Sequence, residues 1–234
     1  MDVHAGKGWQ IKHNVFKNFH TPDDADHLWN AAVLMWRGSQ STVTDSNFFY
    51  NVDRAVAYGL GAMAKDHLGG IISNNVVLMS EGLYSRKRRR NADAPIIVWQ
   101  SPATKVLHNT VITNGNMPFA IESRFDASGI SLANNLTDAP IVHSDGDIKR
   151  NLCKFSGMCK KYLSMYENQN VMNANRNWFI DIDRGSAQLK PQTDLGGRYL
   201  SRFSEAPVDM IGTIREKSVT PGAFELSGVA VASE

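Results

Sequence analysis

The chain has 234 residues, of which 42% are hydrophobic and 21% charged, and this composition supports a packed core. The formal net charge of +2 gives no global field that would recruit nucleic acid or an anionic membrane. No apolar run approaches the roughly 18 residues that a membrane-spanning helix needs, and residues 1–10 do not read as a secretory signal.

A recurring asparagine is the main pattern along the chain. Each copy follows a short stretch of alternating apolar residues, and most precede an apolar pair: Asn14, Asn47, Asn75, Asn109, Asn135 and Asn151. The intervals between them are 33, 28, 34, 26 and 16 residues. A constant local pattern at variable spacing is typical of a solenoid, in which every turn keeps one corner and loops are inserted elsewhere.

Two kinds of short strand alternate between these asparagines. Strands that end at the asparagine are predicted at residues 9–13, 42–46, 70–74, 105–108, 129–134 and 147–150. Strands later in each turn are predicted at 31–36, 54–59, 94–99, 119–125 and 139–143. Both kinds are rich in Val and Ile, and helix periodicity is missing from most of the chain. The sequence therefore predicts an all-β fold, a right-handed parallel β-helix.

The asparagines have a structural explanation in such a fold. A corner residue must tolerate a left-handed backbone, which asparagine does better than other non-glycine residues. Stacked side-chain amides can also hydrogen-bond to one another along the solenoid. We therefore expect a ladder of asparagines at the corners, with His13 and His108 as further corner residues.

Alignment of the later strands defines columns of side chains, because side chains alternate across a strand. The inward columns are Val33, Val56, Ile96, Ile121 and Ile141, and beside them Met35, Tyr58, Val98, Ser123 and His143. The outward columns are Leu34, Ala57, Ile97, Glu122 and Val142, and beside them Trp36, Gly59, Trp99, Arg124 and Ser144. A solvated sheet face should be polar, so the tryptophans indicate a candidate binding surface.

The remaining segments bear on domain organisation. Coils are expected over residues 1–151, and residues 152–234 are expected to form an irregular segment, a last coil and a closing strand that caps the end of the same domain. No cap is visible on the first coil, so we expect a carboxy-terminal part of a longer chain. Its bare edge should favour end-to-end self-association or be buried under the chain's own tail. Cys153 and Cys159 are expected to be free thiols, with a small disulfide loop as the alternative.

Several segments resemble bacterial secreted right-handed β-helix proteins of the pectate-lyase-like superfamily. They are VHAGKGWQIKHNVFKNF, AAVLMWRGSQSTVTDSNFFYNVDRAVAYGLG, DHLGGIISNNVV, APIIVWQSPATKVLHNTV, and AIESRF with GISLANNLTDAPI. The resemblance covers most of residues 3–145, and TPGAFE (residues 220–225) stands where many relatives read DIGAFE. It implies the fold and a secreted or periplasmic location. The superfamily includes lyases, hydrolases, epimerases and adhesins, so function has to be argued from the site.

The resemblance implies a site for an acidic polysaccharide on the outward face. Tryptophan rings stack on sugar rings and arginines pair with uronate carboxylates, which makes Trp36, Arg37, Arg54 and Trp99 the candidate substrate-binding residues. Lyases of the superfamily often use Arg or Lys as the base and neutralise the carboxylate with Arg or calcium. Arg124 is then the candidate base, and Glu122 orients it or binds calcium. The alternative is a surface ion pair worth under about 1 kcal/mol, with the tryptophans under long loops.

The loop before Gly69 holds the third candidate catalytic residue, His67. A histidine there is suited to general acid or base chemistry near neutral pH, and the alternative is a loop histidine bonded to backbone. The acidic stretch Asp23, Asp24 and Asp26 offers oxygen ligands for calcium but lacks the spacing of an EF-hand loop. No histidines stand at zinc-ligand spacing.

A basic run, Arg86–Arg90, falls in the longest inserted loop and is expected to be solvated. Its natural partner is an acidic polysaccharide; nucleic acid is not expected, since no aromatic residues are interleaved with it. The column Lys12, Asp45, Ser73, Leu107, Ala133 and Lys149 holds one acid, which disfavours a hydrolase. We expect a carbohydrate-active protein, with a polysaccharide lyase acting by β-elimination as the enzymatic interpretation. The alternative is a non-catalytic glycan-binding or surface-structural module.

Overall fold

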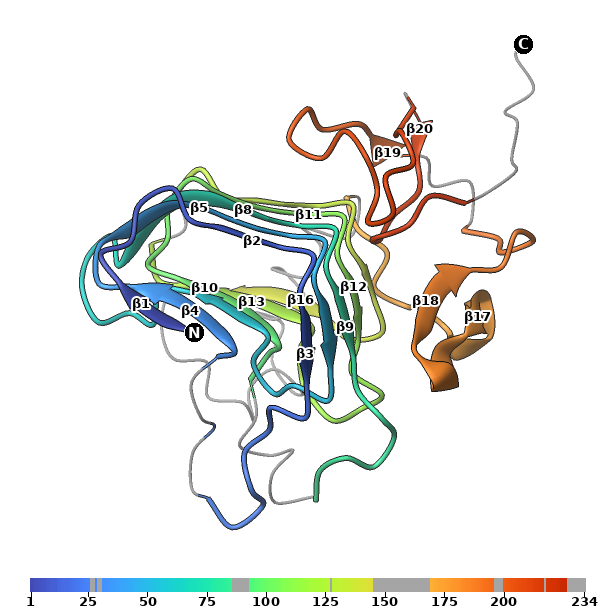
Figure 1. Ribbon diagram of the computed structural model, residues 1–234, viewed down its shortest axis with the longest axis horizontal. Helices are drawn as coiled ribbons and strands as arrows, with labels where there is room; N and C mark the ends of the chain where they lie inside the picture. Colours follow the sequence, from blue (N-terminus) through green and yellow to red (C-terminus); the bar gives the residue numbers. More distant parts are fainter. Residues whose placement is uncertain are drawn as a thin grey trace.

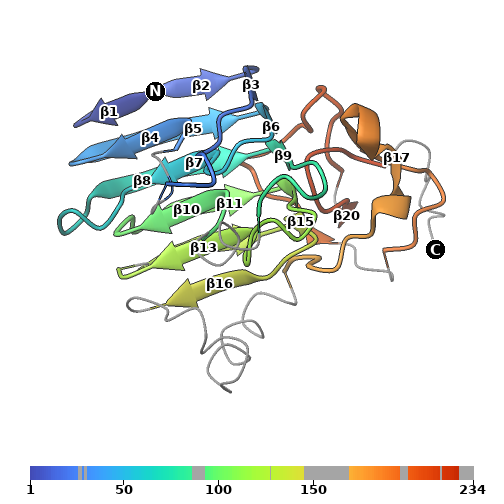
Figure 2. The ribbon, with the colours of Figure 1, turned by 90° about the horizontal axis from the view of Figure 1, so that it is seen from below.

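The computed structural model describes residues 1–25, 28, 31–85, 93–126, 128–144, 169–195, 200–216 and 218–226. Its strands wind into five complete coils and the first strand of a sixth, stacked along one axis (Figure 1). Equivalent strands of successive coils pair in parallel and form three sheets, which Figure 2 shows from the side of the stack. The predicted right-handed parallel β-helix is confirmed.

Sheet A holds the strands predicted later in each turn. Its order is β1-β4-β7-β10-β13-β16, with bounds Asp2–His4, Val33–Trp36, Val56–Tyr58, Ile96–Trp99, Ile121–Arg124 and Ile141–Ser144. The register pairs Val33 with Val56, Val56 with Ile96, and Ile121 with both Ile96 and Ile141. This is the predicted inward column, so the alignment of these strands is confirmed residue by residue.

Sheets B and C meet at the asparagine corner. Sheet B consists of β2 (Gln10–Lys12), β5 (Ser39–Asp45), β8 (His67–Ser73), β11 (Thr104–Leu107) and β14 (Ser131–Ala133). Sheet C consists of β3 (Val15–Lys17), β6 (Phe48–Tyr50), β9 (Val76–Leu78), β12 (Thr110–Ile112) and β15 (Leu136–Thr137). Each coil therefore contributes one strand to every sheet, and the apolar pair after each asparagine begins sheet C.

The asparagine ladder is present and buried. Asn47 Nδ2 lies 3.0 Å from Asn75 Oδ1, and the same bond joins Asn75 to Asn109 at 2.9 Å and Asn109 to Asn135 at 2.9 Å. The rung after Asn135 is Asn170, bonded at 2.9 Å. The predicted rung Asn151 lies outside the described residues, as do Asp26, the run Arg86–Arg90, Lys149 and both cysteines.

The left-handed corner residue is the one before each ladder asparagine. The φ angle is 55° at His13 and Ser46, 54° at Asn74 and His108, and 59° at Asn134. The prediction that the ladder asparagine itself takes this conformation was wrong. Its side chain must reach both the next rung and the carbonyl two residues before it, as Asn109 Nδ2 does with Leu107 O at 3.1 Å, so the chain reverses one residue earlier. His13 and His108 are corner residues, as predicted.

Both faces of sheet A are buried over most of its strands; Asp2 and His4 of β1 are exposed, and Trp36 and Trp99 are partly exposed. The inward columns form the interior core with residues of sheets B and C. The outward residues Leu34, Ala57, Ile97 and Val142 form a second apolar cluster with Ala31, Ala94 and Phe119. The expectation of a solvated outer face was therefore wrong here, because the segments that enter sheet A fold back over it.

The carboxy-terminal region first caps the stack and then runs along its flank. Val171 pairs with Leu136 of β15 in a parallel bridge, and Asn170 continues the ladder, so this segment covers the end of sheet C. The elements η1 (Arg176–Trp178), β17 (Phe179–Asp181), η2 (Ile182–Arg184) and β18 (Ser186–Leu189) follow, and Phe179 and Ala187 pack against the outer side of sheet C.

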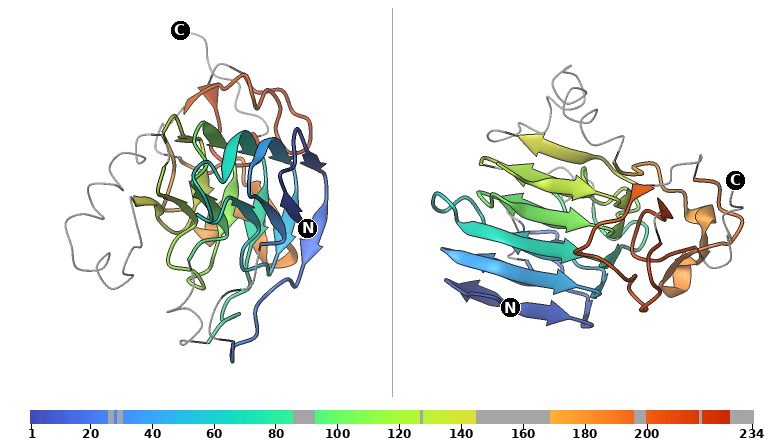
Figure 3. Two further views of the ribbon diagram at one scale, coloured as in Figure 1. Left: turned by 90° about the vertical axis from the view of Figure 1, so that its left-hand side faces the viewer. Right: turned by 90° about the horizontal axis from the view of Figure 1, so that it is seen from above.

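The last described segment, residues 200–226 without 217, is named the strap. It contains the short antiparallel pair β19 (Leu200–Ser201) and β20 (Ser218–Val219). Figure 3 shows the strap in red beside the stacked coils. No helix in the described ranges is long and apolar enough to cross a membrane.

Candidate functional site

Two tryptophans stand in one outward column of sheet A. Trp36 pairs with His4 of the first coil and Trp99 pairs with Arg124 of the fifth. The intervening coil carries Gly59 at this point, because Tyr58 is in register with both Met35 and Val98. Both indoles are partly exposed, and the two rings are separated by two coil spacings, about 9.6 Å.

The Trp36 end of the column carries an exposed cation. The guanidinium carbon of Arg37 lies 4.6 Å from the centroid of the Trp36 ring, and Trp36 Nε1 donates to Asp2 Oδ1 at 2.7 Å. Arg37 is exposed and takes a left-handed φ of 50°. Its backbone N–H donates to the buried carboxylate of Asp66 at 2.7 Å. The backbone of this turn is therefore fixed from the neighbouring coil.

The Trp99 end is different, because its cations are paired. Arg124 lies 4.1 Å over the Trp99 ring and donates to Glu122 Oε1 from Nε at 3.0 Å and from Nη2 at 2.7 Å. Glu122 is fully buried and Arg124 is 7% exposed. The prediction that the two might form only a surface ion pair was wrong, because the covered outer face removes both from water. A buried pair is costly to break, so Arg124 is held in place.

A second paired arginine flanks the same ring. Arg54 Nε donates to Asp93 Oδ1 at 3.1 Å and its Nη2 also contacts this carboxylate, while the guanidinium carbon lies 5.9 Å from the Trp99 ring centroid. Phe125 meets the indole edge-on at 6.4 Å. Trp99 is thus enclosed by two ion pairs and an aromatic ring.

His67 does not join this cluster. It begins β8, is fully buried, and its ring nitrogens lie 3.0 Å from Ser101 Oγ and Thr42 Oγ1. Its ring stacks on Tyr58 at 4.3 Å. Burial lowers the pKa of His67 to about 4, against a smaller opposing effect of Asp66. The interpretation as a loop histidine bonded to backbone was wrong, because strand β8 starts at His67 and turns its ring into the interior.

Sequence reasoning missed the carboxylates that organise the site. Asp66 accepts three backbone N–H groups, from Arg37, Leu60 and Ala62, and Asp93 neutralises Arg54. Neither follows a recognised motif, and the bonds of Asp66 to Arg37 and of Asp93 to Arg54 join residues of different coils. The nearest signal in the sequence was the position of Asp66 directly before His67, on the loop that precedes Gly69.

The described residues contain no group of three or more His, Cys, Asp or Glu side chains that could hold a metal ion. Glu122, the residue named for calcium, is bonded to Arg124. In the acidic stretch, Asp23 accepts from the backbone of Ser85 at 3.4 Å.

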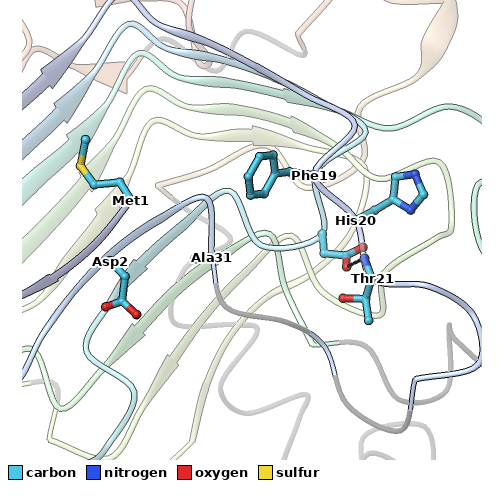
Figure 4. A pocket seen from close by; sticks show the side chains of 7 residues that line it. Met1, Asp2, Phe19, His20, Thr21 and Ala31 are labelled. Atoms are coloured by element: carbon cyan, nitrogen blue, oxygen red, sulfur yellow. Dashed lines mark hydrogen bonds between the residues drawn. The ribbon is translucent and has the colours of Figure 1, made fainter.

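A cavity of about 250 Å³ lies at the first coil, near the Trp36 end of the column. Figure 4 shows Met1 and Asp2 on one side of it and Phe19, His20 and Thr21 on the other. Asp53 borders it and accepts from the backbone of Thr21 at 2.5 Å. Asp2 also anchors the Trp36 indole, so the cavity and the tryptophan share a residue.

Comparison with known proteins adds no relative to these observations. A scan against protein-family models gave no match. Searches of the curated proteins and of the solved structures gave no match either.

Proposed function

We propose that this β-helix binds an acidic polysaccharide at the outer edge of sheet A. The observation that carries the proposal is the exposed guanidinium of Arg37 lying over the partly exposed indole of Trp36, 4.6 Å from the ring centroid. An apolar ring face and a forked cation side by side match the two parts of a uronate residue, the sugar ring and its carboxylate.

Trp99 extends the same surface. It stands two coils from Trp36 in the same column, a separation of about 9.6 Å, which suits consecutive contacts along a polymer. Arg54 and Arg124 already have carboxylate partners, so in this proposal they orient Trp99 and Arg37 is the group that pairs with the ligand. The resemblance to the pectate-lyase-like superfamily and a secreted or periplasmic location belong to this proposal as well.

β-Elimination is the second candidate function, and one contact favours it. Glu122 holds Arg124 by two hydrogen bonds over the Trp99 ring, as an orienter would hold a base beside a stacked sugar. The burial of Arg124 and its ion pair oppose this assignment, because a base has to reach the substrate proton. Binding without catalysis is therefore the function that the geometry favours.

The test measures affinity for a panel of uronate polysaccharides at low and high salt. Trp36→Ala should weaken binding at every salt concentration, since stacking rests on apolar contact. Arg37→Ala should weaken binding at low salt and flatten the salt dependence, since exposed charges are screened over about 10 Å at 0.1 M. Arg184→Ala is the matched control, because its side chain is 88% exposed on the flank.

One outcome would distinguish the lyase from a binding protein, and another would refute the proposed site. Ultraviolet absorbance of unsaturated product from the wild-type protein, lost in Arg124→Ala, would establish the lyase. Binding that is unchanged in Trp36→Ala and Arg37→Ala but altered in Arg184→Ala would place the contact elsewhere and refute the proposed site.

A further inference from the structure

The strap docks onto the left-handed corner column of the coils through polar groups. Asn74 Nδ2 donates to Val208 O at 3.1 Å and Asn134 Nδ2 donates to Ser201 O at 2.9 Å. The backbone N–H of Gly222 donates to Asn134 O at 2.8 Å. His108, between these two asparagines in the column, is fully buried although His13 in the same column is exposed. The strap is therefore what removes His108 from water.

A buried arginine anchors the strap at the same place. Arg215 is fully buried; its guanidinium contacts the Glu225 carboxylate and donates to Asn74 Oδ1 at 2.8 Å and to Gly222 O at 3.2 Å. Asp209 Oδ2 accepts the backbone N–H of Glu225 at 3.0 Å. The docked strap thus places a cation beside the His108 ring.

The hydrogen bonds of Asn134 define the protonation state of His108. Asn134 Nδ2 lies 2.9 Å from His108 Nε2, and the same nitrogen donates to Ser201 O of the strap. Because that atom is a donor toward Ser201, Nε2 has to be an acceptor, so the docked state needs a neutral imidazole. A proton on Nε2 would face the amide N–H₂ group, and an amide rotated to accept it would turn its oxygen toward Ser201 O.

We propose that His108 makes the strap an acid-sensitive latch, in which protonation of the ring releases residues 200–226 from the corner of coils 3 to 5. The coils themselves stay folded, because their hydrogen bonds run from rung to rung and do not pass through the strap.

Docking of the strap weakens as the pH falls, because docking and protonation of His108 are linked. Burial, and then the charge of Arg215, lower the pKa of His108 to about 3, against the smaller opposing effect of the Thr220 and Gly222 backbone. An exposed histidine titrates near 6.5, so the released state binds the proton more tightly than the docked state. Docking is then complete above pH 6.5 and weakens about tenfold per pH unit below it, about 25-fold between pH 7 and pH 5.

The charged groups around the ring shape this response. Arg215 faces it from the strap with Glu225 and Asp209 beside it, and Asp45 lies within electrostatic reach of Arg215 on the coil side. Carboxyl groups in general titrate near pH 4, so the interval from pH 7 to pH 5 isolates the imidazole.

Hydrogen exchange on the whole chain tests the latch. The amides of Gly222 and Ala223, which donate to Asn134 O and Thr110 Oγ1, should lose about 25-fold protection between pH 7 and pH 5 after correction for intrinsic rates. Amides of sheet C should stay better protected than those of the strap at both pH values, because the coils remain folded when the strap is released. His108→Asn, which suits the left-handed position as Asn74 and Asn134 do, should abolish the pH response, and His13→Asn should retain it.

Three results would overturn the proposal. They are pH-independent protection of Gly222 and Ala223 in the wild type, an unchanged pH response in His108→Asn, and equal protection of the strap and sheet C at both pH values. Nitrogen NMR of the imidazoles gives an independent reading: a protonated His108 at pH 5.5 in molecules whose strap is still docked would also refute the latch.

Discussion

At the scale of single residues, the stack depends on asparagines that satisfy buried backbone groups as well as one another. Asn109 Nδ2 donates to Ile72 O at 2.9 Å and to the next rung, and its Oδ1 accepts the backbone and side-chain N–H groups of Asn75. One side chain therefore joins three coils. No apolar residue of similar size could replace these bonds, although it would fill the same space.

Asn109→Leu should destabilise the fold by about 1–3 kcal/mol, because it leaves buried donors and acceptors without partners. Chemical unfolding monitored by circular dichroism measures the change. Asn14→Leu is the matched control: Asn14 is exposed at the first rung, so its replacement should cost clearly less. Equal shifts in the two variants would show that burial of the ladder contributes nothing.

At the scale of elements, the turn from sheet A to sheet B is organised by one carboxylate. Asp66 is fully buried and accepts the backbone N–H of Arg37 at 2.7 Å, of Leu60 at 2.8 Å and of Ala62 at 3.1 Å. The loop that it closes begins at Gly59, where an added Cβ would stand 2.0 Å from Trp99 O. Glycine and aspartate together let this coil carry a loop without disturbing its neighbours.

Asp66→Asn should cost about 1.5–3 kcal/mol, because hydrogen bonds to a charged acceptor are the strong ones and the amide N–H₂ group would face backbone donors. Denaturant midpoints give the value, and hydrogen exchange should show lost protection at Arg37, Leu60 and Ala62. Asp126→Asn controls for the substitution: this exposed carboxylate accepts from the backbone of Ser128 at 3.0 Å, so its loss should matter little. A wild-type midpoint for Asp66→Asn would contradict the assigned role.

At the scale of the whole molecule, buried neutral imidazoles link stability to pH. The folded pKa of His67 is lowered to about 4, so the unfolded chain binds this proton more tightly. The contribution of the neutral His67 ring to the free energy of unfolding is therefore complete above pH 6.5. It falls by about 3 kcal/mol toward pH 4, since one pKa unit corresponds to about 1.4 kcal/mol. His67→Gln should remove this part of the pH dependence, whereas the exposed His4→Gln should not. Unfolding midpoints between pH 7 and pH 4.5 measure it, and an unchanged slope in His67→Gln would refute it.

The coils could be predicted from the sequence and the surroundings of the site could not, for a physical reason. Side-chain alternation reports which residues share a column, so the register of Val33, Val56 and Ile96 was readable. What covers a column depends on segments that return from elsewhere in the chain, and nothing local in Glu122 or Arg124 announces their burial. The rung Asn170 was missed in the same way, since a local pattern cannot tell where the chain rejoins the stack. The predicted self-association stays a prediction.

The ladder also gives the stack a direction. Each rung donates from its backbone and side-chain amides to the Oδ1 atom of the following rung, from Asn14 to Asn47 and onward to Asn170. The side-chain amide dipoles therefore point in the same direction along the whole corner. A rung added before Asn14 would have to be a donor. Two copies that met by their first coils about a two-fold axis, with these corners facing each other, would bring oxygen against oxygen, so the ladder cannot continue through such a pairing.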